Sequence, residues 1–400
     1  MSGAQPRSSP PASFAILLAS KAIGGEERFL AELAGAMRRT TTRPVILNLK
    51  SPMPYAVELQ RDGVLVREGI ANHRLDPAGL ARLIRALRQT RPDVLLINSN
   101  RQALILGGIA SRLCRIPVTL VHTHEHQGHA ATTIRCMVYI SDGIVAAADH
   151  HREYLRSELR LPEGRVARVY PGINLDRTRS GAAPRAVGSV PDKVRTTVGI
   201  VAALRPEKDH ETFLRAAAIV AEQLPDTRFL IIGDGPRRPY LEGLARDLRV
   251  DQRVQFLGWQ PVDSNLLGRL DVLALSSVSE TFPAVILEAF SAGVPVVATD
   301  VGSVAELCGV PPCGVLVPPR DPAALARALA ALLIDPARSQ QMGAAAVQRV
   351  KYFSSDRFCR DMLFLTQRIA SAKVHTSRPD ISQLLEQSTA SVRSVSVSAD

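Results

Sequence analysis

A chain of 400 residues that is 46% hydrophobic and 22% charged is long enough for two globular domains and too apolar to be intrinsically disordered. It contains no run of about eighteen or more apolar residues, which excludes a membrane-spanning helix of ordinary length. The five cysteines are scattered and odd in number, so they predict neither a disulfide framework nor a zinc site, and a reduced, cytoplasmic protein fits best.

The positive charge is concentrated in the N-terminal half. Residues 1–190 contain 26 Lys and Arg against 15 Asp and Glu, whereas the remainder contains 23 of each, so the whole net charge of +11 lies in the first part. This favours an acidic partner for that half, such as an anionic membrane surface or a phosphorylated glycolipid. Nucleic acid is not expected, because aromatics make up only 4% and no nucleic-acid motif occurs. Surface charge without a function is the alternative.

The first predicted elements are a disordered leader over residues 1–12, a buried strand over 13–20 and a helix that follows Gly24 and Gly25. Glycines allow a close backbone approach, and the N-terminus of a helix offers free N–H groups to an anion. The turn is therefore a candidate phosphate-binding loop. Many β-to-α turns contain such a pair, and an ordinary turn is the alternative.

Further strands are expected over 45–49, 63–67 and 94–98, with a helix over 76–91. That helix has aliphatic residues on one side, and arginines at every third position run along the other side. It either lies on anionic lipid or covers the sheet with a solvated basic face.

Four of the nine histidines lie within 120–129, at the end of another apolar run. Their alternate spacing invites a metal site, but no carboxylate or cysteine cluster completes a ligand set, so no metal is predicted. Strands over 143–147 and 166–170 follow, and the Gly-, Pro-, Ser- and Ala-rich stretch at 178–193 marks a domain boundary. The predicted organisation is a leader over 1–12, a first domain over 13–180, a linker over 181–192, a second domain over 193–354, a helix over 355–370 and a disordered tail over 371–400.

The second half begins with a strand over 197–202, followed by Arg205 and Lys208 in the loop before the next helix. Two cations three residues apart can flank a diphosphate, the Arg as a planar fork and the Lys as a point charge. Solvated surface cations are the alternative. After a strand over 228–232 comes Gly233-Asp234-Gly235-Pro236, which by itself indicates only a turn.

The most informative segment is 276–306. Glu280 lies in a loop after a buried strand, and Pro283 suits the first turn of a helix that should run from about residue 282 to about 292. Glu288 lies eight residues after Glu280 and inside that helix, among apolar neighbours. An ionised carboxylate is costly in such surroundings unless it has partners, so a binding function is favoured over a solvated surface charge.

This segment resembles the E-x7-E signature of retaining GT-B glycosyltransferases of family 4, also called group 1. The matching positions are Ser279, Glu280, Phe282, Pro283, Leu287, Glu288, Ala289, Gly293, Pro295, Thr299, Gly302 and Glu306, whereas Thr281 stands where the family often has Gly. The resemblance covers roughly residues 13–370 and is strongest over 197–321. It implies an α/β protein with the GT-B fold, in which two Rossmann-like domains face a central cleft and the last helix crosses back to the first domain.

The resemblance also implies roles for individual residues. Arg205, Lys208, Gly24 and Gly25 would bind the donor phosphates, although Arg205 stands two positions later than the family's usual arginine. His124, and His122 as second choice, would face the donor sugar and the acceptor. Glu280 would contact the sugar hydroxyls, and the nucleoside and sugar would be bound by Glu288, Gly233, Asp234, Gly235, Phe282 and Pro283.

The implied function is a retaining glycosyltransferase that moves a sugar from a nucleotide-diphospho-sugar to a glycan or lipid-linked acceptor. No D-x-D pair occurs in the chain, so we predict that neither a metal nor another cofactor is required. The expected setting is bacterial surface polysaccharide or lipopolysaccharide assembly, in the cytoplasm, with peripheral contact to the inner membrane face through the basic N-terminal half. Two alternatives stay open: a GT-B sugar-nucleotide 2-epimerase, and a non-catalytic nucleotide-sugar-binding subunit.

Overall fold

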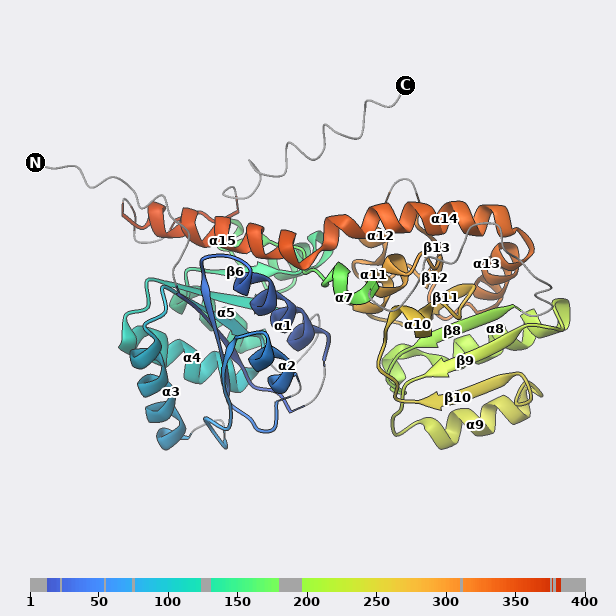
Figure 1. The fold of residues 1–400 in the computed structure, drawn as a ribbon, viewed down its shortest axis with the longest axis horizontal. Coiled ribbons are helices and arrows are strands. Elements are labelled where there is room, and N and C mark those ends of the chain that lie inside the picture. Colours follow the sequence, from blue (N-terminus) through green and yellow to red (C-terminus); the bar gives the residue numbers. More distant parts are fainter. Residues whose placement is uncertain are drawn as a thin grey trace, which may run out of the picture. The chain divides into compact units, whose positions relative to one another are not determined.

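The computed structural model describes residues 13–21, 24–53, 55–73, 76–123, 131–179, 196–309, 312–374, 376 and 379–382. It divides into two compact units (Figure 1). Unit 1 comprises residues 1–172 and 355–400, and unit 2 comprises 173–354.

Unit 1 contains a seven-stranded sheet in the order β3-β2-β1-β4-β5-β6-β7, and every neighbouring pair is parallel. Its strands are β1 (Ser13–Leu18), β2 (Arg43–Asn48), β3 (Leu65–Arg67), β4 (Val94–Asn98), β5 (Val118–Thr123), β6 (Gly143–Ala146) and β7 (Val166–Arg168). The strand order reverses between β1 and β4, and open parallel sheets bind ligands at such a switch point, beyond the carboxyl ends of the strands.

Helices cover both faces of this sheet. They are α1 (Gly25–Arg38), α2 (Ala56–Arg61), α3 (Pro77–Thr90), α4 (Arg101–Cys114), α5 (Ala131–Ile140), α6 (Asp149–Ser157) and α15 (Ser355–Ala372), with a short 3-10 turn, η1 (Glu163–Arg165). Helix α1 packs against α15, whereas α4 packs against both α3 and α5. The strands are apolar along most of their length because both faces are buried, as is typical of parallel sheets.

Unit 2 contains a six-stranded parallel sheet in the order β10-β9-β8-β11-β12-β13. Its strands are β8 (Thr197–Val201), β9 (Arg228–Ile232), β10 (Val254–Gly258), β11 (Val272–Leu275), β12 (Val296–Thr299) and β13 (Gly314–Val317). Its helices are α7 (Leu175–Arg179), η2 (Pro206–Lys208), α8 (His210–Gln223), α9 (Arg238–Asp247), α10 (Ser264–Leu267), α11 (Ala284–Ser291), α12 (Val304–Cys308), α13 (Pro322–Ile334), α14 (Pro336–Arg349) and η3 (Val350–Phe353). The predicted α/β class with two Rossmann-like sheets is confirmed.

Several predicted boundaries differ from the structure. The chain leaves unit 1 after Gly172, earlier than expected, and the predicted leader and linker lie outside the described residues. Helix α11 begins at Ala284, after Pro283 at its N-cap, rather than near residue 282. The prediction of a disordered tail is wrong at Ile381, which is fully buried and donates its backbone N–H to the Gly164 carbonyl at 2.8 Å. Within the described residues, no helix is long and apolar enough to cross a membrane.

Candidate functional site

Three loops of unit 2 meet at the carboxyl edge of its sheet. The Ser276 hydroxyl, just after β11, donates to the carbonyls of Lys208 and Asp209 at 3.0 and 2.9 Å. The Thr299 hydroxyl, at the end of β12, donates to the Ser277 carbonyl at 2.6 Å. Because Ser276, Ser277 and Thr299 are all buried, these bonds fix the backbone of the loops that follow β8 and β11.

Lys208 and Glu280, both predicted site residues, form an ion pair. The Lys208 Nζ lies 2.7 Å from the Glu280 Oε1, and the Ser277 hydroxyl donates to the same oxygen at 2.7 Å. Within the described part of the chain, the other carboxylate oxygen, Oε2, accepts no hydrogen bond. The Lys208 and Glu280 side chains are 25% and 9% exposed, so solvent screens their attraction less than it would on an open surface. The loop therefore presents an ammonium beside a carboxylate with one oxygen left for a ligand.

Glycines bring the neighbouring backbone close to this pair. Gly302 has φ +57°, and a side-chain carbon there would overlap the Glu280 carbonyl oxygen. Gly233 has φ +138°, and a side-chain carbon there would overlap the Ala202 carbonyl oxygen. The Leu204 N–H donates to the Asp234 carbonyl at 3.0 Å, which holds the Gly233–Gly235 turn beside the loop that contains Arg205.

The remaining predicted residues of unit 2 differ in exposure. Arg205 is exposed at the N-cap of η2. Glu288 is 3% exposed within α11, and the ring of Phe282, which is 5% exposed, packs edge-on against Phe353 with centroids 5.9 Å apart. The structure thus brings Lys208 and Glu280 into contact. Arg205, Glu288 and Phe282 also lie in unit 2.

His210, which the sequence did not single out, is buried directly after this loop. It is 1% exposed, and neither ring nitrogen has a hydrogen-bond partner among the described residues. Burial, reinforced by the charge of Lys208, lowers the pKa of His210 to about 4. The imidazole is therefore neutral at physiological pH, and it contributes packing rather than charge.

In unit 1, a second polar cluster lies where β1, β4 and β5 end. Gly24 is the N-cap of α1 and Gly25 its first residue. The Glu26 carboxylate accepts hydrogen bonds from the Ser99 backbone N–H at 3.2 Å and from the Ser99 hydroxyl at 2.9 Å. The His122 Nδ1, which is fully buried, lies 3.6 Å from the Glu26 Oε1.

Sequence reasoning named His122 but missed Glu26 and Ser99. A usable signal was present, because Ser99 follows directly on a buried strand and Glu26 directly on the glycine pair. His124, the first choice at this strand end, lies outside the described residues. Among the residues that are described, no group of three or more His, Cys, Asp or Glu is arranged to hold a metal ion.

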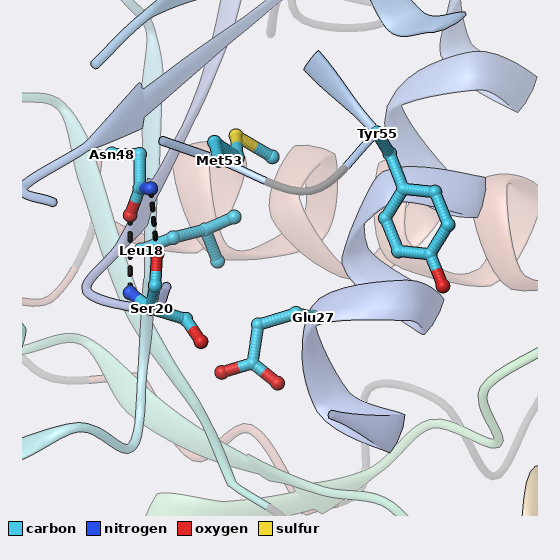
Figure 2. A pocket seen from close by; sticks show the side chains of 6 residues that line it. All are labelled: Leu18, Ser20, Glu27, Asn48, Met53 and Tyr55. Atoms are coloured by element: carbon cyan, nitrogen blue, oxygen red, sulfur yellow. Dashed lines mark hydrogen bonds between the residues drawn. The ribbon is translucent and has the colours of Figure 1, made fainter. Parts of the chain in front are cut away.

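A small hollow lies beside this cluster, also at the carboxyl edge of the sheet (Figure 2). It is lined by Leu18, Ser20, Glu27, Asn48, Met53 and Tyr55. Figure 2 shows the Glu27 carboxylate turned toward Ser20, with Leu18 and Met53 above it and the Tyr55 ring to one side. Burial is the main reason that the pKa of Glu27 is raised, and the charge of Glu26 adds to the shift.

Comparison with known proteins gives family matches in both halves of the chain. The family model described as Glycosyl transferases group 1 matches residues 188–349, and the model described as Glycosyltransferase Family 4 matches residues 23–177. A D-inositol 3-phosphate glycosyltransferase from Streptomyces scabiei is 32% identical over 400 residues, with 88% of this chain and 86% of that protein covered.

Two further relatives show how coverage varies. A 2-deoxystreptamine glucosyltransferase from Streptomyces kanamyceticus is 28% identical over 325 residues, with 75% of this chain and 82% of that protein covered. A D-inositol 3-phosphate glycosyltransferase from Catenulispora acidiphila is 34% identical, but the match covers only 54% of each chain.

Solved structures share the fold at lower identity. A glycosyltransferase from Rickettsia africae superposes with a TM-score of 0.76 at 19% identity, covering 89% of this chain and 98% of that one. Alr3699/HepE from Anabaena in complex with UDP-glucose superposes with a TM-score of 0.72 at 21% identity, covering 91% and 100%. At these identities the likeness establishes the fold alone.

Proposed function

The chain belongs to glycosyltransferase family 4 and has the GT-B fold of two Rossmann-like domains, and from that premise we propose a retaining, metal-independent transferase. It would move a sugar from a nucleotide-diphospho-sugar to a hydroxyl of an acceptor. The observation that supports this most is the pairing of Lys208 with Glu280 at the carboxyl edge of the unit 2 sheet. In this pair, an ammonium group suited to bind a phosphate lies beside a carboxylate oxygen suited to accept a hydrogen bond from a sugar hydroxyl.

Unit 2 is the proposed donor site. Lys208 and the exposed Arg205 neutralise the diphosphate, the role that a metal ion has in other transferases, so no cofactor is required. Glu288 holds the ribose hydroxyls, while the backbone of Gly233 to Gly235, with Phe282 and Pro283, lies along the nucleoside and sugar. The UDP-glucose in the Anabaena structure supports a nucleotide-sugar donor.

The proposed chemistry needs no separate base. The acceptor oxygen bonds to the anomeric carbon on the face that the nucleotide leaves, while the bond between that carbon and the diphosphate oxygen breaks. The acceptor proton passes to the departing phosphate, and the sugar keeps its configuration. Lys208 and Arg205 stabilise the negative charge that grows on the leaving group. The Glu280 Oε2 accepts a hydrogen bond from a sugar hydroxyl, and the negative charge of the carboxylate stabilises the oxocarbenium-like sugar ring in the transition state.

Unit 1 is the proposed acceptor side. The roles proposed for its residues are donor-phosphate binding for Gly24 and Gly25, and action on the reacting sugar for His122 and His124. The His122 ring lies beside the Glu26 carboxylate. The acceptor is a glycan, a lipid-linked glycan or a cyclitol of the kinds that the names of the Streptomyces relatives indicate. The setting proposed is bacterial surface polysaccharide or lipopolysaccharide assembly in the cytoplasm. The excess positive charge of residues 1–190 supports peripheral contact with an anionic membrane.

The proposal is tested by measuring nucleoside diphosphate release from UDP-, GDP- and ADP-sugars with EDTA present. The acceptors are a membrane extract, 2-deoxystreptamine and D-inositol 3-phosphate. We expect release from one donor, dependent on acceptor and unaffected by EDTA. If one donor binds tightly but no donor releases nucleoside diphosphate, the transferase is contradicted and a non-catalytic subunit is favoured. An epimerised donor formed without acceptor would instead indicate the 2-epimerase.

A further inference from the structure

A second hollow, with a volume of about 380 Å³, lies at the amino edge of the unit 1 sheet. It is lined by residues from the first turns of chain in β1, β2 and β3 and from the last turns of α1 and α3. Strand β1 has six residues, so about 20 Å of extended chain separate this hollow from the carboxyl edge that holds Glu26 and His122. A ligand in the hollow is therefore out of reach of the unit 1 residues assigned to the reaction.

Three arginines from three different elements line this hollow. They are Arg38 at the end of α1, Arg43 at the start of β2 and Arg67 in β3. Gln89 and Thr90, at the end of α3, add an amide and a hydroxyl group. None of the described residues that line the hollow is acidic. Its wall therefore has three positive charges and neutral polar groups.

Neutral partners hold two of the three guanidinium groups. The Arg67 Nη1 donates to the Gln89 Oε1 at 2.7 Å, and the Arg38 Nε donates to the Asp62 backbone carbonyl at 3.4 Å. Arg38 also lies against Gly63, where a side-chain carbon would come within 3.0 Å of the Arg38 Nη2. A guanidinium has five N–H donors, so most of them stay available to a ligand. Groups that are held in place beforehand lose less freedom on binding.

The absence of a carboxylate partner distinguishes these arginines from others in unit 1. Within the described part of the chain, Arg38, Arg43 and Arg67 form no ion pair. The dipole of α1 favours a cation in its last turn, which accounts for Arg38 alone. Like charges around one hollow repel one another, and a bound anion offsets that repulsion. Paired arginines elsewhere in unit 1 are Arg39 with Asp356, Arg82 with Asp76, and Arg168 with Asp149.

The size and the chemistry of the hollow indicate its ligand. A guanidinium fork matches the oxygens of a phosphate, to which it can donate two parallel hydrogen bonds. Small-molecule sites have volumes of about 300 Å³ and more, so the space suits a phosphate that is attached to a ring rather than a free ion. Pro44, Val45 and Leu65 add an apolar wall for the ring carbons.

We propose that this hollow binds a small phosphate ester of a cyclic polyol, such as a sugar phosphate, at a site separate from the donor and acceptor sites. The inference goes beyond the proposed transfer, which assigns no role to this edge of unit 1. A lipid headgroup can present the same phosphate monoester, and the experiment therefore distinguishes a soluble ester from a membrane surface.

Calorimetric titration of the full chain with glucose 6-phosphate and with glucose tests the site. We expect the phosphate ester to bind and glucose, which has the same ring without the phosphate, to give no measurable heat. Arg43→Gln should weaken binding of the ester by about tenfold or more, the size expected of one charge-assisted hydrogen bond. The double variant Arg43→Gln/Arg67→Gln should abolish measurable binding.

Two control variants separate this site from general charge and from the donor site. Arg85→Gln removes an exposed arginine of α3 outside the hollow and should bind the ester as the native chain does. Lys208→Ala removes the cation of the proposed donor site, and binding of the ester should again persist. Arg43 has no described side-chain partner to lose, so the melting curve of Arg43→Gln should match that of the native chain.

Four results would overturn the site. They are no binding of glucose 6-phosphate, equal binding by the native chain and the double variant, loss of binding in Lys208→Ala, and binding only to vesicles that contain phosphatidic acid. Release of nucleoside diphosphate from a donor is measured separately, so each of these results leaves the proposed transferase intact. Binding of the ester without turnover of any donor would support this site and reject the transferase.

Discussion

At the scale of single residues, Lys208 has two anions within its reach in the proposed reaction, the Glu280 carboxylate and the donor diphosphate. The 2.7 Å contact with Glu280 holds the ammonium in place before the donor arrives, which reduces the reorganisation required in the transition state. Ser277 keeps a hydrogen bond to the same carboxylate oxygen, so Glu280 stays oriented when Lys208 turns toward phosphate.

Lys208→Ala should lower kcat by about 10²–10³-fold, the usual cost of removing one preorganised charge or donor from the transition state. Lys351→Ala, an exposed lysine in the same unit, serves as the control and should leave steady-state rates unchanged. Equal rates for the native chain and Lys208→Ala would show that this lysine does not stabilise the leaving group.

His210 predicts a pH dependence of stability. Its pKa is about 4 in the folded chain and about 6.5 when unfolded, so between these values the unfolded chain binds more protons. The contribution of His210 is complete above about pH 6.5 and is lost as pH falls toward 4. Urea unfolding should therefore show a free energy that falls by up to ~1.4 kcal/mol per pH unit in this window. An unchanged slope in His210→Leu would contradict this assignment.

At the scale of elements, the loops after β11 and β12 depend on close backbone contact. Gly302 and Gly293 share a positive φ, +57° and +70°, but only at Gly302 would a side chain overlap the Glu280 carbonyl. At Gly293 the nearest atoms are 3.5 Å away. A substitution at Gly293 therefore measures the cost of backbone strain alone. A substitution at Gly302 measures the same strain together with displacement of the loop that contains Glu280.

Gly293→Ala should cost about 1–2 kcal/mol of stability, from its left-handed backbone alone, with kcat/KM unchanged. Gly302→Ala should cost more than that and should also lower kcat/KM, because the loop that carries Glu280 must move. Urea unfolding and steady-state kinetics on both variants measure the two effects. Matching losses of stability with full activity in both variants would mean that this contact does not position Glu280.

The elements also show what sequence patterns can predict. The continuous apolar runs predicted most strands and the loops after them that contain Lys208 and Glu280, and the resemblance to family 4 implied the two Rossmann-like sheets. They did not predict the ion pair, because its partners are 72 residues apart and meet only through the strand order β8-β11. Glu26 and Ser99 are 73 residues apart and were missed for the same reason. Ile381 was missed because the apolar residues of the Ser-rich tail are few and irregularly spaced, so they give no periodic signal.

At the scale of the whole molecule, the two units have separate hydrophobic cores and separate proposed roles. Hydrogen exchange with and without UDP should therefore show protection in residues 203–209 and 276–282 of unit 2. Strand β2 of unit 1 should exchange at the same rate in both conditions. If UDP protects only residues of unit 1, the nucleotide binds to unit 1, and the assignment of unit 2 as the donor side is contradicted.

The resemblance to family 4 is confirmed at this scale, since both halves match the family and the fold is shared with solved glycosyltransferases. The proposed retention of configuration and the proposed independence from metal concern the reaction itself, so a measurement on the product tests them.

The most direct test is a proton NMR time course of the full chain with its donor and acceptor in the presence of EDTA. We predict that the anomeric signal of the donor declines as a product signal of the same anomeric configuration and free nucleoside diphosphate rise together. A product of opposite configuration, an epimerised donor, or a reaction that requires added divalent metal would contradict a retaining, metal-independent transferase.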